Sequence, residues 1–224
     1  MEKVPFGAYD FFGYVAPGLV VLAGLEWTLG YPHVLHADLK VAAIAVLVLA
    51  VYVAGHVVAE PARAVLEDWV ARRLLGPPSV NLLSASSPRL AGRLLGSYLV
   101  PLPAATQARV KGRASREGCR ETGEPLFLHA RFHQETLANE RLLAKLDRFV
   151  SLYGFARNMA FACLAVSIAL GVKVAIGRGA PADATRAALL VGAGLLLFVR
   201  FLKFYRLYSF ELLNNYGSYR EGGQ

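Results

Sequence analysis

Residues 41–58 read VAAIAVLVLAVYVAGHVV and contain no formal charge. An α-helix rises about 1.5 Å per residue, so a helix of about this length crosses the roughly 30 Å hydrocarbon core of a bilayer. Three further apolar stretches lie at 11–30, 158–176 and 187–208. We therefore predict an all-α integral membrane protein with four transmembrane helices.

The composition agrees with a membrane protein. Of the 224 residues, 55% are hydrophobic and only 18% are charged, and the mean hydropathy is +0.42. Such a chain is not disordered, because disorder needs low hydrophobicity and high charge. The two cysteines, Cys119 and Cys163, are far apart in sequence, so they indicate neither a disulfide scaffold nor a multi-cysteine zinc module.

The distribution of basic residues predicts the orientation of the helices. Between Pro61 and Arg157 the chain has fifteen Lys or Arg against eight Asp or Glu. The connections 31–40 and 177–186 together hold only three basic residues. Loops rich in Lys and Arg stay in the cytoplasm. We expect a multi-pass protein of the bacterial inner (plasma) membrane, with both termini and the long insert in the cytoplasm.

Four regions follow from this topology. They are a first transmembrane helix pair at 1–60, a basic helical cytosolic insert at 61–156, a second transmembrane pair at 157–208 and a cytosolic tail at 209–224. No alternating apolar and polar pattern in the insert indicates a strand, so we expect helices throughout.

Within the insert, the helix-breaking residues Gly and Pro predict where helices end. The helix that enters from Pro61 should stop at Gly76-Pro77-Pro78, and a short helix should follow at Ser87 to Leu99. The polar segment 107–125 is expected to be an exposed turn or a loosely held helix rather than packed core. From Leu126 onward, the apolar spacing predicts one long helix that runs into the third membrane span.

Charged residues beside the apolar stretches are expected to form an intramembrane polar cluster, because an unpaired charge in hydrocarbon costs at least a few kcal/mol. The expected members are Asp10, His56, Glu60, Arg157 and Arg200. We expect Arg200 to contact Asp10 or Glu60, directly or through His56. The cluster is either a polar gate or ion pathway, or a charge network that fixes the register of the helices.

A basic run in the insert predicts contact with an anionic ligand, such as the headgroups of the cytoplasmic leaflet. Its residues are Arg109, Lys111, Arg113, Arg116 and Arg120. The run lacks aromatic residues on which bases stack, so we do not expect nucleic acid as a partner.

His129 and His133 are four residues apart, the spacing at which two imidazoles on a helix can bind one metal ion. A third ligand is not recognisable in the sequence, so we interpret the two histidines as a solvated or packed pair and expect no metal. Catalytic and cofactor-binding motifs are also not recognisable. We therefore expect a protein that is not an enzyme and has no cofactor.

Three short blocks carry a resemblance. They are YDFFGYVAPG at 9–18, VAGHVVAE at 53–60 and RFLKFYR at 200–206. In these blocks the chain resembles a loose class of small uncharacterised bacterial membrane proteins, similar to the transmembrane effectors or membrane partners of prokaryotic antiviral defence systems. The resemblance implies a membrane effector and no catalytic residues.

The sequence therefore favours a non-enzymatic membrane protein that receives a cytosolic signal or protein partner and acts at the bilayer, with homo-oligomers expected. The alternative is a small ion channel or transporter that uses His56, Glu60 and Arg200 as its polar pathway. A third possibility is a membrane-bound enzyme that acts on lipid, with Asp10, His56 and Glu60 at a suitable depth.

Overall fold

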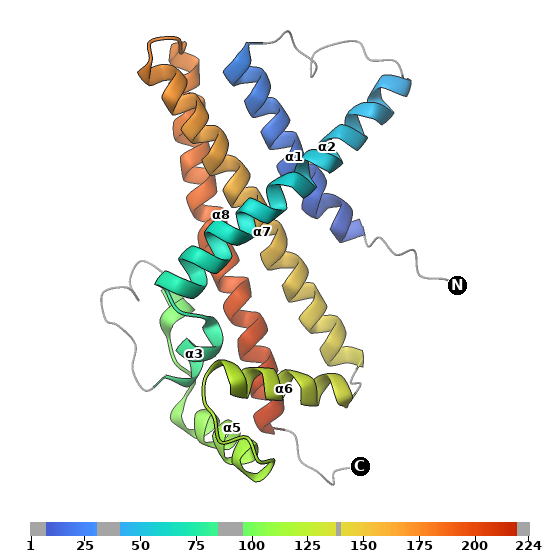
Figure 1. The fold of residues 1–224 in the computed structure, drawn as a ribbon, viewed down its shortest axis with the longest axis vertical. Helices are drawn as coiled ribbons and strands as arrows, with labels where there is room; N and C mark the ends of the chain where they lie inside the picture. Colours follow the sequence, from blue (N-terminus) through green and yellow to red (C-terminus); the bar gives the residue numbers. More distant parts are fainter. Residues whose placement is uncertain (1–7, 31–40, 85–95, 138–139, 219–224) are drawn as a thin grey trace. The chain divides into compact units, whose positions relative to one another are not determined.

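The computed structural model describes residues 8–30, 41–84, 96–137 and 140–218 (Figure 1). Within these ranges the secondary structure is helical and contains no strand. The helices are α1 (Ala8–Leu29), α2 (Val41–Ala62), the π-helix η2 (Arg63–Leu74), α3 (Pro78–Leu83), the 3-10 turn η3 (Gly96–Leu99), α5 (Ala104–Arg116), α6 (Glu124–Thr136), α7 (Glu140–Ala175) and α8 (Pro181–Ser218).

Three helical segments of the described residues are long and apolar enough to span a membrane. They are Ala43–Leu83, Glu140–Ala175 and Pro181–Ser218, and the apolar helix Gly13–Leu29 is shorter. The all-helical expectation is thus confirmed, and the chain has the composition of a helical membrane protein.

Two compact units divide the chain. The first contains the described residues up to Asp68 together with Gly154–Phe201, and the second contains Trp69–Tyr153 together with the described residues from Leu202. Helices α7 and α8 each contribute to both units, because each is a single helix that crosses a unit boundary. Residues 209–218, expected in a tail, continue α8.

Close contact between α1 and α2 organises the first unit (Figure 1). A Cβ atom on Gly18 would overlap the carbonyl oxygen of Val51, and one on Gly55 would overlap the backbone of Tyr14. The two backbones therefore meet where neither helix has a side chain, as is common between membrane helices.

Polar contacts tie α7, α8 and α1 together at one end of the first unit. Lys173 donates to the backbone oxygen of Trp27 at 2.5 Å and lies 3.0 Å from the Asp183 carboxylate. Arg186 reaches the same carboxylate at 3.0 Å and lies over the Trp27 ring. A buried acid thus joins two basic residues from two helices.

The second unit has a contiguous apolar core built from all of its longer helices. Its buried residues are Leu82, Leu83, Leu102, Val110, Ala114, Leu126, Phe127, Ala130, Leu142, Leu146, Leu212, Leu213 and Tyr216. This core explains a wrong prediction: α6 and α7 are separate helices. A single straight helix would hold Leu126 and Leu146 about 30 Å apart, whereas the break lets both enter one core.

The prediction of an exposed turn or a loosely held helix at 107–125 was also wrong in part. Pro103 precedes α5, which is a regular helix with Val110, Arg113 and Ala114 buried. Most of the short helix predicted at Ser87 to Leu99 lies outside the described residues, and its end forms η3. The predicted helix end before Gly76-Pro77-Pro78 is confirmed, since η2 ends at Leu74.

Replacing Gly18 by Ala should separate α1 from α2, because the new methyl group overlaps the Val51 backbone, which cannot move aside like a side chain. We expect a loss of about 1–3 kcal/mol in the free energy of unfolding, seen as a lower thermal midpoint in detergent. Gly13→Ala on the same helix is the matched control, since nothing from another element lies within 4 Å of that position. Equal midpoints for the two variants would contradict this account of the crossing.

Candidate functional site

The site begins at the carboxyl end of α5, where Arg113 and Glu117 lie one helical turn apart. Gly118 has a φ of +84°, and the backbone N–H groups of Gly118 and Cys119 return to the carbonyls of Ser115 and Ala114. This is the hydrogen-bond pattern of a Schellman motif, which favours Gly at the left-handed position. The motif ends the helix directly after Glu117 and so fixes where its carboxylate lies.

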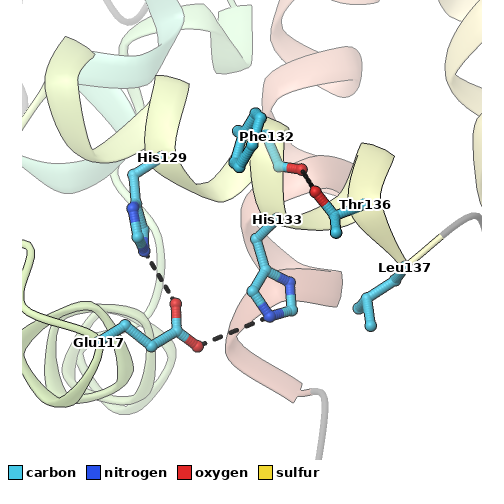
Figure 2. A pocket seen from close by; sticks show the side chains of 6 residues that line it. All are labelled: Glu117, His129, Phe132, His133, Thr136 and Leu137. Atoms are coloured by element: carbon cyan, nitrogen blue, oxygen red, sulfur yellow. Dashed lines mark hydrogen bonds and ion pairs between the residues drawn. The ribbon is translucent and has the colours of Figure 1, made fainter.

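Two histidines of α6 face this carboxylate, as Figure 2 shows. His129 Nε2 lies 2.8 Å from Glu117 Oε2, and His133 Nε2 lies 3.7 Å from Glu117 Oε1. Their spacing of four residues puts both imidazoles on one side of α6. The buried face of the same helix carries Leu126, Phe127 and Ala130, so core packing directs the histidines toward α5.

The end of α8 supplies the third side of the site. The hydroxyl of Tyr216, a fully buried residue, donates to Glu117 Oε2 at 2.8 Å. Arg113 donates to the Tyr216 backbone oxygen at 2.9 Å, and its guanidinium lies over the Tyr216 ring. Residues about 100 positions apart in sequence therefore share one hydrogen-bond network.

The network assigns the protons of both imidazoles. Arg113 Nε donates to Glu117 Oε1 at 2.6 Å, and its Nη2 lies 2.8 Å from His133 Nε2. A guanidinium only donates, so His133 Nε2 accepts and the hydrogen of the neutral ring is on Nδ1. An ionised carboxylate only accepts, so His129 Nε2 carries its hydrogen. When both rings are neutral, the network therefore holds the two histidines in opposite tautomers.

Glu117 is ionised in this setting. Burial raises the pKa of its carboxyl, but hydrogen bonds from Arg113, Tyr216 and His129 outweigh that effect and lower the pKa from 4.5 to about 2. Hydrogen bonds to the charged form favour it, and those from ionised donors are the strongest. The carboxylate is therefore negative throughout the physiological pH range.

An open pocket of about 340 Å³ lies beside this network. It is lined by Glu117, His129, Phe132, His133, Thr136 and Leu137 (Figure 2). Among the described residues, no group of three or more His, Cys, Asp or Glu is arranged to hold a metal ion. The site can offer a small ligand one negative charge, hydrogen-bond acceptors and an aromatic ring.

The residues of the predicted polar cluster make different contacts. His56 stacks on Tyr14 at 3.8 Å between ring centroids and meets Tyr52 edge-on. Arg157 forms an ion pair with Glu67 and contacts Asn158. Glu60 and Arg200 are exposed, and the side chain of Asp10 lies outside the described residues. The contact predicted for Arg200 remains a prediction.

The predicted anion-binding residues divide into two groups. Arg109, Lys111, Arg116 and Arg120 are exposed. Arg113, expected among them, is buried and paired with Glu117, so the internal network uses its donors. Glu117 was missed in the sequence, although its spacing from Arg113 and the following Gly118 were visible there. Its contact with Tyr216 joins residues too distant for any local pattern to indicate.

The chain was compared with protein-family models, with curated proteins and with solved structures, and none of the three comparisons found a match.

Replacing Glu117 by Gln should destabilise the second unit at neutral pH by about 2 kcal/mol, because Arg113 loses the charge that neutralises it. The native pKa lies below the unfolded value. The carboxylate's contribution is therefore fully present above pH 4.5 and is lost as the pH falls toward about 2. Thermal unfolding of both proteins across this range should show their difference shrinking in acid. Glu121→Gln, at an exposed acid nearby, is the control, and a gap independent of pH would contradict the assignment.

Proposed function

We propose that this chain is a non-enzymatic inner-membrane protein whose second unit receives a cytosolic signal or partner and whose apolar helices act at the bilayer. We propose further that it works as a homo-oligomer, with four transmembrane helices and the second unit in the cytoplasm. The proposal joins a site for a ligand to helices that can respond to it.

One observation carries this proposal. Helices α7 and α8 are each continuous, and each contributes to both compact units. A helix transmits displacement and rotation along its length, since its backbone hydrogen bonds resist bending. Tyr216 anchors one end of α8 to the Glu117 network. A change at that network therefore has a direct covalent and helical route to the apolar half of the chain.

The membrane setting rests on composition and charge. Three helical segments have the length and hydropathy of membrane spans. Basic residues are concentrated between Pro61 and Arg157, which supports a cytoplasmic second unit under the positive-inside rule. The exposed Arg109, Lys111 and Arg116 leave positive charge for anionic headgroups or for an acidic protein partner. The resemblance to membrane effectors of antiviral defence systems suggests the biological setting.

The channel alternative receives less support from the described contacts. His56 packs among tyrosines, and Arg157 pairs with Glu67, an acid outside the predicted pathway. A charge network that fixes helix packing explains these contacts without ion flow. For the alternative of an enzyme acting on lipid, the described contacts suggest no catalytic residue beyond Asp10, His56 and Glu60.

A break in α7 at the boundary between the units tests the proposal. Gly154→Pro removes a helical hydrogen bond and kinks α7, whereas Gly154→Ala keeps the helix intact. A Cβ atom at position 154 has nothing within 4 Å, so neither substitution causes a clash there. Overproduced wild type and Gly154→Ala should form cross-linked oligomers and depolarise the membrane, measured with a potential-sensitive dye. Gly154→Pro should reach the membrane in equal amount without depolarising it. A wild type that stays monomeric in lipid and leaves the membrane intact would refute the proposal.

The topology gives a separate prediction. Reporter tags at residues 1 and 224 should both lie in the cytoplasm, because an even number of spans returns the chain to its starting side. After Cys119 and Cys163 are replaced by Ser, single cysteines at positions 36 and 182 should react with an impermeant reagent only from outside. Tags on opposite sides of the membrane would mean an odd number of spans.

A further inference from the structure

The polar groups around the pocket are mainly acceptors. The Glu117 carboxylate accepts at both oxygens, and Thr136 uses its hydroxyl hydrogen on the backbone oxygen of Phe132 at 2.9 Å. His129 donates through Nε2 to Glu117, and its Nδ1 is an acceptor when the ring is neutral. Nδ1 of His133, which carries the hydrogen, is buried. A ligand that fits this lining must bring hydrogen-bond donors.

The charge of the lining has one sign. Glu117 is the charged residue among those that line the pocket when the histidines are neutral. Its partner Arg113 is 5% exposed, is not part of the lining and spends its donors on Glu117, Tyr216 and His133. The ion pair therefore presents its negative end to the pocket, which favours a cation at short range.

The remaining walls are apolar and aromatic. Phe132 is 71% exposed and Leu137 lies at the end of α6. An open phenyl face attracts an ammonium or guanidinium group within about 6 Å of its centroid. The pocket is open and has a volume of about 340 Å³, which suits a small organic ligand better than a single ion.

We propose that this pocket binds an organic cation, an ammonium or guanidinium group on a short apolar body, with its charge between Glu117 and the ring of Phe132. The cation can be a free small amine or guanidine, or the Arg or Lys side chain of a partner. The inference deepens the proposed function, since it names the signal that the second unit receives. Binding draws the carboxylate toward the ligand and weakens its hydrogen bond from Tyr216, which anchors α8.

Calorimetric titration of the full chain, purified in a detergent with an uncharged headgroup, tests the site with n-butylguanidinium. The uncharged n-butylurea has nearly the same shape and should bind at least about tenfold more weakly, because it lacks the charge. Phe132→Ala should weaken n-butylguanidinium binding about three- to tenfold. This variant tests binding without a folding penalty, since Phe132 is so exposed. Leu128→Ala, at an exposed residue of the same helix outside the pocket, is the matched control and should bind normally.

Glu117→Gln should abolish the preference of the guanidinium over the urea, measured on protein whose circular dichroism matches the wild type. Tighter binding of N-acetyl-arginine amide than of n-butylguanidinium would identify a partner's side chain as the ligand, and the reverse order a free small molecule. Equal binding of the guanidinium and the urea, or equal binding by wild type and Phe132→Ala, would overturn the proposal. These titrations need no membrane activity. Normal binding of n-butylguanidinium by a protein that does not depolarise the membrane would therefore refute the proposed function but not the proposed cation site.

Discussion

The second unit depends on a single carboxylate that three helices share. Glu117 ends α5, accepts from His129 of α6 and accepts from Tyr216 of α8. Arg113 neutralises it from a buried position. A partly buried carboxylate is most stable with its full set of donors, so a displacement of any one of the three helices removes a hydrogen bond that the other two contribute to positioning. The apolar core alone would tolerate small shifts between these helices, since hydrophobic contact is not directional.

The first unit is held together by different physics. In a bilayer, apolar surface gains little by leaving lipid, so close packing and a few polar contacts would have to fix helices of this composition. Gly18 and Gly55 provide the close packing, because the backbones of α1 and α2 meet at these two positions. Lys173, Arg186 and Asp183 provide polar contacts near one end of α7 and α8. The buried pair of Arg157 and Glu67 adds another, since each charge would be costly without its partner.

What the sequence could predict follows from the range of the forces involved. The long apolar helices could be predicted because the ability of a helix to span a membrane depends on the length and composition of one segment. The sequence did not predict α5 as a packed helix, because the segment is mostly polar and its buried residues form only a short stripe centred on Val110 and Ala114. At the site, the spacing of His129 and His133 was visible in the sequence, but their contact with Glu117 was not. Arg113 and Glu117 meet Tyr216 from about 100 residues away, and pairing over such a separation leaves no local pattern.

The pocket and the core of the second unit use different sides of α6. His129, Phe132, His133 and Thr136 recur at spacings of three and four residues, so they lie on one side of the helix and line the pocket together with Leu137. Leu126, Phe127 and Ala130 of the same helix are buried in the core, which Leu142 and Leu146 reach from the separate helix α7. Core packing fixes which side of α6 faces inward, and it therefore also fixes which side faces Glu117 and the pocket.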